Sequence, residues 1–252
     1  MRIFCALILL IALVVPAGAQ RLVSTLSNQT VAISSSFDGE TLTMFGNVEP
    51  AEETPLAAPQ GPYEVVILVT GPLTDRVARR KTRQFGIWIN TEQVLFERFP
   101  SYFHVLASRP LAEITTPATL AAEGILPEVQ AERAARTDWW SATIYARELV
   151  RLMTERRYFG VEEPGVRFLS TTAYSAQLTL PHDVPNGAFL ATTLVFSDGE
   201  IVARRAERFN VRKVGFERFL GNAAVQYPLF YGVFCVFLAL FTGWLGGVVF
   251  KR

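Results

Sequence analysis

The chain of 252 residues is half hydrophobic, and its 24 basic residues almost balance 23 acidic ones. The net charge of +1 argues against a polyanionic partner such as nucleic acid. Both cysteines, Cys5 and Cys235, lie in hydrophobic end segments, which excludes a disulfide, a cysteine nucleophile and a cysteine zinc site from the region between them.

The N-terminal segment has the order of a secretory signal peptide. Arg2 precedes an apolar run at residues 3–15, and a small-residue cleavage site ends at Ala19. The run is shorter than the ~20 residues that a membrane helix needs. We therefore expect cleavage after Ala19, with an uncleaved N-terminal anchor as the alternative.

Short strands are predicted in the part that follows. Alternation around Val31 and the segment 41–45 each predict a strand, with a turn at residues 38–39 between them. Residues 49–62 are rich in Pro, Ala and Glu and predict an exposed loop. The nearly continuous apolar segment 63–72 predicts a buried central strand.

The stretch VARRKTRQFGIWIN at residues 77–90 changes from basic to apolar. Strand periodicity makes both faces polar at its start and apolar at its end. This predicts an edge strand that starts in solvent and enters the core, its charges discouraging edge pairing. The alternative is an anion- or partner-binding patch. Its candidate residues are Arg79, Arg80, Lys81, Arg83 and Trp88.

A helical insert is predicted at about residues 117–160, which are rich in helix formers. Thr137 or Asp138 is the expected N-cap of its main helix, and Gly160 the expected stop. The predicted buried face of this helix consists of Ala142, Ala146, Leu149, Val150 and Met153.

Strands are predicted again after the insert. They fall at residues 166–170, 173–181, 188–196 and 200–211. Turn residues at 185–187 and 198–199 predict hairpins between the last of them. The fold predicted is mainly β, an immunoglobulin-like antiparallel β-sandwich with a helical insertion. Two subdomains divided near residue 110 are the alternative.

No catalytic or cofactor motif is recognisable, and we expect no cofactor and no metal. The two histidines, His104 and His182, are interpreted as a strand residue and a solvated turn residue. A metal site that joins them to Asp or Glu, or a catalytic role for His182, is the alternative. Trp139 and Trp140 are predicted to anchor the helix to the sheet.

The C-terminal segment predicts a single transmembrane helix. Residues 228–250 carry no charge and are long enough to cross ~30 Å of hydrocarbon. Residues 214–227 predict an amphipathic helix at the bilayer surface. A small-residue stripe predicts close packing against another membrane helix. Its residues are Ala239, Gly243 and Gly247.

These segments define the organisation expected for a type I, single-pass membrane protein. It consists of a signal peptide at 1–19, a periplasmic domain at 20–213, a juxtamembrane segment at 214–227, a transmembrane helix at 228–250 and a cytoplasmic tail at 251–252. An exported domain does not meet nucleic acid, so the basic stretch is not interpreted as a nucleic-acid site.

The segments FGNVEP, VARRKTR, GIWIN, LPHDVPNG and KVGFERFL, followed by the C-terminal span, together resemble a family of alphaproteobacterial transmembrane proteins. The resemblance covers nearly the whole mature chain. It implies an exported domain in the periplasm and a span in the inner membrane. It carries no established activity, but members are described beside permeases of the sulfite-exporter type.

We therefore expect a non-enzymatic, membrane-anchored periplasmic binding or accessory protein that works with an inner-membrane permease. The alternatives are a membrane-anchored periplasmic hydrolase and a structural envelope homodimer. The expected partners are the inner membrane and either an integral membrane protein or a second copy of the chain.

Overall fold

The computed structural model describes residues 21–33, 39–49, 62–214 and 216–249. The expected signal peptide, the 38–39 turn, most of the 49–62 loop and the cytoplasmic tail fall wholly or partly outside these residues. The fold is mainly β, with one apolar helix at the C-terminus.

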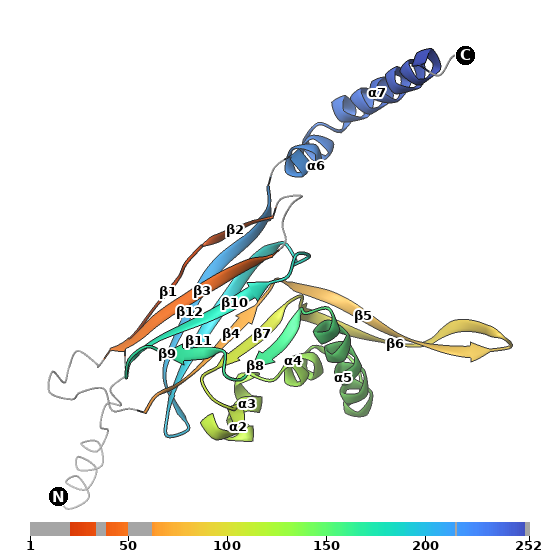
Figure 1. The fold of residues 1–252 in the computed structure, drawn as a ribbon. Helices are drawn as coiled ribbons and strands as arrows, with labels where there is room; N and C mark the ends of the chain where they lie inside the picture. Colours follow the sequence, from red (N-terminus) through yellow and green to blue (C-terminus); the bar gives the residue numbers. More distant parts are fainter. Residues whose placement is uncertain (1–20, 34–38, 50–61, 215, 250–252) are drawn as a thin grey trace, which may run out of the picture.

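Two sheets form the body of the protein (Figure 1). The first has the strand order β1 (Arg21–Leu26), β3 (Glu40–Glu49), β10 (Ala173–Leu180), β9 (Val166–Phe168). The second has the order β2 (Thr30–Ile33), β12 (Glu200–Lys213), β11 (Gly187–Ser197), β4 (Glu64–Thr70), β7 (Phe103–Ala107), β8 (Phe159–Glu162). Most pairs are antiparallel, as predicted, but the edge strands β2 and β8 pair in parallel with β12 and β7. A parallel neighbour requires a crossover, and between β7 and β8 the helical insert supplies it.

The two predicted hairpin turns differ in outcome. Asp198 and Gly199 have φ of 50° and 83° and join β11 to β12 as a hairpin, which confirms the prediction. The turn at 185–187 instead carries the chain from one sheet to the other, because β10 and β11 belong to different sheets. That hairpin prediction was wrong.

The six-stranded sheet has an apolar core on each face. On one face it packs against the four-stranded sheet, where Leu42 and Met44 of β3 meet Val65 and Ile67 of β4 in one cluster. On the other face it is covered by the helices α2 (Leu111–Ile114), α3 (Pro117–Glu123), α4 (Pro127–Ala134) and α5 (Trp139–Glu155). Burial on both faces explains why β4 is apolar at nearly every position, and it confirms the predicted central strand.

Helix α5 confirms most of its predicted features. The Asp138 side chain caps it by accepting a hydrogen bond from the backbone N–H of Ser141. Its buried residues are Ala142, Ala146, Val150 and Met153, and Leu149 is partly buried. The helix ends at Glu155, however, and Gly160 lies in β8, so Gly160 is not the helix stop.

The two tryptophans at the start of α5 do not anchor it. Trp139 is 75% and Trp140 62% exposed, and their rings contact each other at a centroid distance of 5.6 Å. The small residues Ala142 and Ala146 make the contact with the core instead. The anchoring prediction was therefore wrong.

A two-stranded hairpin, β5 (Leu73–Gln84) and β6 (Ile87–Pro100), projects from the body and is called the arm (Figure 1). Its turn is Phe85-Gly86, with φ of 50° and 86°. The prediction that residues 77–90 enter the core was wrong. The chain turns back just before its apolar residues. Ala78 on the outgoing strand is only partly buried, and full burial starts on the return strand, at Val94 and Phe96.

Two helices follow β12 at the C-terminus, α6 (Phe216–Gln226) and α7 (Pro228–Val249). Residues 228–248 form a helix long and apolar enough to cross a membrane, with none of it buried in the protein. Pro228 at its first position lacks an N–H and costs no intrahelical hydrogen bond there. These features agree with the predicted span.

The end of the six-stranded sheet at which β12 leads into α6 is called the exit end, marked by the pair Gly187 and Val211. The arm begins there too, because Pro72 lies against Gly187, where a Cβ would come within 2.9 Å of the proline ring. Phe103 on β7 pairs with Thr70 on β4, and Thr70 pairs with Leu190 on β11, which lies three residues beyond Gly187. The span, the arm and this part of β7 therefore share one end of the body.

Candidate functional site

A cavity of about 690 Å³ opens near the exit end and is called the His104 pocket. Its wall comes from His104 on β7, residues 154–159 from the end of α5 to the start of β8, Glu162, and residues 179–183 from the end of β10 onward. The pocket brings both histidines to one place. Sequence spacing gave no sign of this, because the link from β10 to β11, which joins the two sheets, carries His182 to the end of the six-stranded sheet where His104 lies.

His104 is nearly buried, and its ring stacks on Tyr102 with a centroid distance of 4.8 Å. Nε2 lies 3.3 Å from the carbonyl oxygen of Arg157, whereas Nδ1 is buried without a hydrogen-bond partner. Burial lowers the pKa of His104, although the bond to the Arg157 carbonyl opposes this. The ring is therefore neutral at neutral pH, and the 4.0 Å approach of Nδ1 to Glu162 is not an ion pair there. With Nε2 donating, Nδ1 presents an unused lone pair.

Gly160 fixes the position of this ring. A Cβ at Gly160 would lie 2.6 Å from Cε1 of His104, which is closer than real atoms pack. The glycine therefore serves close packing against the imidazole rather than a helix terminus. Behind the ring, the hydroxyl of Tyr102 is also buried without a partner, and burial and then the Glu162 charge raise its pKa.

Some charged side chains around the pocket have a partner in the protein and others do not. Asp183 accepts a hydrogen bond of 2.8 Å from the hydroxyl of Tyr158, and Glu155 pairs with Arg151 at 2.5 Å. In the part of the chain that the structure describes, the guanidinium groups of Arg156 and Arg157 have no carboxylate partner.

A third guanidinium, that of Arg76 at the base of the arm, lies close enough to the pocket to affect the pKa of Tyr158. Burial, followed by the hydrogen bond to Asp183, raises the pKa of Tyr158, and the nearby charges of Arg156 and Arg76 oppose that rise. The Nε of Arg76 is buried without a hydrogen-bond partner. Free positive charge beside a neutral imidazole fits a small anion better than a cation. Among the described residues, no three His, Cys, Asp or Glu side chains are placed to hold a metal ion.

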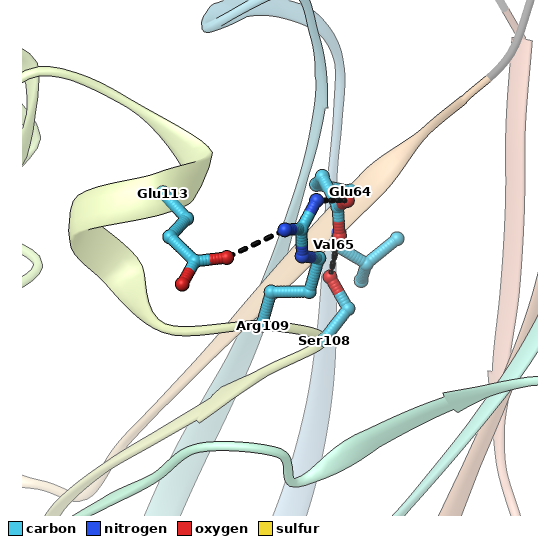
Figure 2. Close-up of polar contacts among 5 residues, drawn as sticks. All are labelled: Glu64, Val65, Ser108, Arg109 and Glu113. Carbon is cyan, nitrogen blue, oxygen red and sulfur yellow. Dashed lines mark hydrogen bonds and ion pairs between the residues drawn. The ribbon is translucent and has the colours of Figure 1, made fainter.

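A second polar cluster lies where β4 begins and β7 ends (Figure 2). The hydroxyl of Ser108 donates to Glu64 at 2.5 Å and accepts from the backbone N–H of Val65 at 3.0 Å. The Arg109 guanidinium donates to Glu113 at 2.5 Å and to Glu64 at 3.4 Å, and the hydrogen bond to Glu64, followed by the charge of Glu113, raises the pKa of Arg109. Each polar group drawn in this cluster has a partner within it, so it ties β4, β7 and α2 together and is structural.

The basic candidates from the sequence all lie on the arm, away from the His104 pocket. Arg83 pairs directly with Trp88 across the hairpin, and Arg80 lies 3.7 Å from Glu92. The hairpin thus gathers the predicted patch, which is formed by Arg79, Arg80, Lys81, Arg83 and Trp88.

Among the residues that the structure describes, the two glycines of the α7 stripe have no close neighbour, since a Cβ at Gly243 or Gly247 would meet no atom within 4 Å. Its role in helix packing stays a prediction. An apolar groove of about 510 Å³ lies between Phe219 on α6 and Phe234 on α7.

Over residues 21–252 the chain matches the family described as "Putative transmembrane protein (Alph_Pro_TM)". No curated protein matches it. The family agrees with the α7 span in making this a membrane-anchored protein.

Proposed function

The chain belongs to the Alph_Pro_TM family of transmembrane proteins, and from that premise we propose that it is a periplasmic binding protein anchored in the inner membrane. It holds a small anion in the His104 pocket and serves an integral membrane partner such as a permease. The signal peptide at 1–19 exports the domain, and α7 retains it in type I orientation.

One observation carries this proposal. Within the described residues, the His104 pocket combines an imidazole with a free lone pair, a second histidine, and arginines that have no carboxylate partner. Unsatisfied polar groups in a concave site are stabilised when a ligand pairs with them. The carboxylates Asp183 and Glu155 already have partners in the protein. Glu162 also lines the pocket, 4.0 Å from Nδ1 of His104, but Arg156 and Arg157 outnumber this one carboxylate, so the lining favours an anionic ligand.

The position of the pocket supports the membrane partner. His104 follows Phe103, which lies near the exit end of the six-stranded sheet. The chain leaves this end for α6 and the span. A ligand held here is close to the membrane, where a permease could receive it.

The proposal includes an immunoglobulin-like relation of the two facing sheets. The shared core between them and the β11–β12 hairpin support it. The parallel pairs β2–β12 and β7–β8 depart from that pattern at its edges.

The test measures anion binding by the full chain in lipid nanodiscs. Sulfate, sulfite and phosphate are titrated, and the shift in Tm reports binding to the folded state. We expect one anion to raise the Tm, and Arg156→Gln or His104→Gln to abolish the shift. Arg167→Gln, on the surface of β9, is the matched control. No shift with any anion, or equal shifts in all variants, would refute the pocket assignment.

A membrane-anchored hydrolase is the second candidate, because His182 and Asp183 line the same cavity as His104. A neutral imidazole could accept a proton from water or a hydroxyl. Turnover of p-nitrophenyl esters or phosphates that disappears in both His104→Gln and His182→Gln would favour the hydrolase. A homodimer without ligand or partner is the third reading, and co-purification separates it from the first.

A further inference from the structure

We propose that the tip of the arm binds the anionic surface of the membrane in which α7 is anchored. The tip consists of Phe85, Gly86, Ile87, Trp88 and Ile89, flanked by the basic residues Arg79, Arg80, Lys81 and Arg83. This inference does not rest on the His104 pocket, and it assigns a role to a part of the chain that the proposed function leaves unused.

The apolar residues of the tip have no function in the fold. Phe85 is fully exposed at 104%, Trp88 is 66% and Ile87 64% exposed, and none belongs to either core cluster. The proximal part of the arm is held differently. There the backbone N–H of Arg136 donates to the carbonyl of Leu95, and Val94 belongs to the second core. The arm is therefore attached to the body at its base and exposes apolar side chains at its tip.

Charge determines which occupant fits the tip. Residues 79–93 contain four basic side chains and one acidic side chain, Glu92, which lies near Arg80. Trp88 lies directly across the hairpin from Arg83. Tryptophan and arginine side by side match the boundary between headgroups and acyl chains, where the indole lies at headgroup level and the guanidinium meets anionic phosphate.

Geometry brings the arm and the membrane together. The arm starts at Pro72, at the exit end, where β12 also leads into α6. A β5 strand of 12 residues is about 40 Å long at ~3.3 Å per residue. In Figure 1 the arm and the α6–α7 segment extend to the same side of the body. A bilayer around α7 is thus within reach of the tip.

The experiment uses the full chain in nanodiscs made with or without phosphatidylglycerol. Cys5→Ala and Cys235→Ala remove the native thiols, and Ile87→Cys carries a bimane label. A lipid with a nitroxide on its headgroup quenches labels that lie at the surface. The matched control is a label at Leu169→Cys, which is 61% exposed and follows β9.

We expect the tip label to be quenched several-fold more than the control label, and more strongly with phosphatidylglycerol than without. Replacing Arg79, Lys81 and Arg83 by Gln removes the dependence on phosphatidylglycerol. Equal quenching at tip and control overturns the proposal. Energy transfer between tip labels of two chains in one disc also overturns it, because it assigns the tip to a second copy. Either failure leaves anion binding in the His104 pocket unchanged, so the two proposals fail separately.

Discussion

Strand β4 and the tip of the arm are both rich in apolar residues, but those of β4 are buried and those of the tip are exposed to solvent. The apolar residues of β4 from Val65 to Val69 are all buried, between the four-stranded sheet on one face and the helices on the other. The apolar residues of the tip are exposed on both faces of a two-stranded ribbon. Apolar strands are therefore not equivalent. Those of β4 stabilise the fold, and those of the tip are available to a partner surface.

The largest expected effect is a difference in the free energy of unfolding between a variant in the core around β4 and a variant in the tip. Phe196→Ala, in the second core, removes a fully buried ring and should lower the free energy of unfolding by about 3–5 kcal/mol. Trp88→Ala should change it by no more than about 0.5 kcal/mol, since an exposed side chain loses little packing. Denaturant unfolding of both variants measures the difference. A comparable loss in Trp88→Ala would mean that the tip is packed in the folded protein.

The next effect tests whether the wall of the His104 pocket is as tightly packed as the core. Gly160→Ala places a methyl group against the imidazole of His104 and should cost about 1–3 kcal/mol. Gly232→Ala is the control, because this glycine of α7 has open space around it and alanine favours a helix, so the change should be neutral or slightly stabilising. Thermal unfolding compares the two, and a neutral Gly160→Ala would show that the ring is free to move.

A smaller effect concerns the helix that supports the base of the arm. Asp138→Ala removes the cap of α5 and should cost about 1 kcal/mol. Asp138→Asn keeps an acceptor and should recover most of that loss. Both are measured by denaturant unfolding, and equal losses for Ala and Asn would show that the cap bond does not stabilise the helix.

The smallest expected effect is the pH dependence of the free energy of unfolding that the buried His104 causes. Burial puts the pKa of His104 below its ordinary 6.5, so between these two pKa values the unfolded chain binds a proton that the folded chain does not. The free energy of unfolding should hold above pH 6.5 and fall as the pH drops below it. Unfolding measured from neutral to acid pH should show a shallower fall in His104→Gln than in His182→Gln. Equal slopes would contradict the neutral buried imidazole.

Much of the fold was predictable from local patterns. The period of α5, its Asp138 cap, the buried strand β4 and the C-terminal span each follow from residues close together in the sequence. The errors share a cause. The 185–187 turn and the tryptophans of α5 depend on which element packs against which, and local pattern does not contain that information.

The candidate site was predictable only in part. The basic residues and Trp88 could be named as candidates because they are close together in sequence, and the hairpin places Arg83 opposite Trp88. Their binding role stays a prediction. The His104 pocket was missed because His104 and His182 are far apart in sequence and meet only where the link from β10 to β11 passes the start of β7. Gly160 was interpreted as a helix stop, and its close packing against the His104 ring became visible only in the structure.

The central claim is that this membrane-anchored protein works with an integral membrane partner, and crosslinking in cells tests it most directly. The full chain is crosslinked in native membranes, purified in gentle detergent, and its companions are identified by mass spectrometry. The account predicts one polytopic membrane protein in an amount close to that of the chain. Recovery of the chain alone, as a monomer or a homodimer, would contradict it.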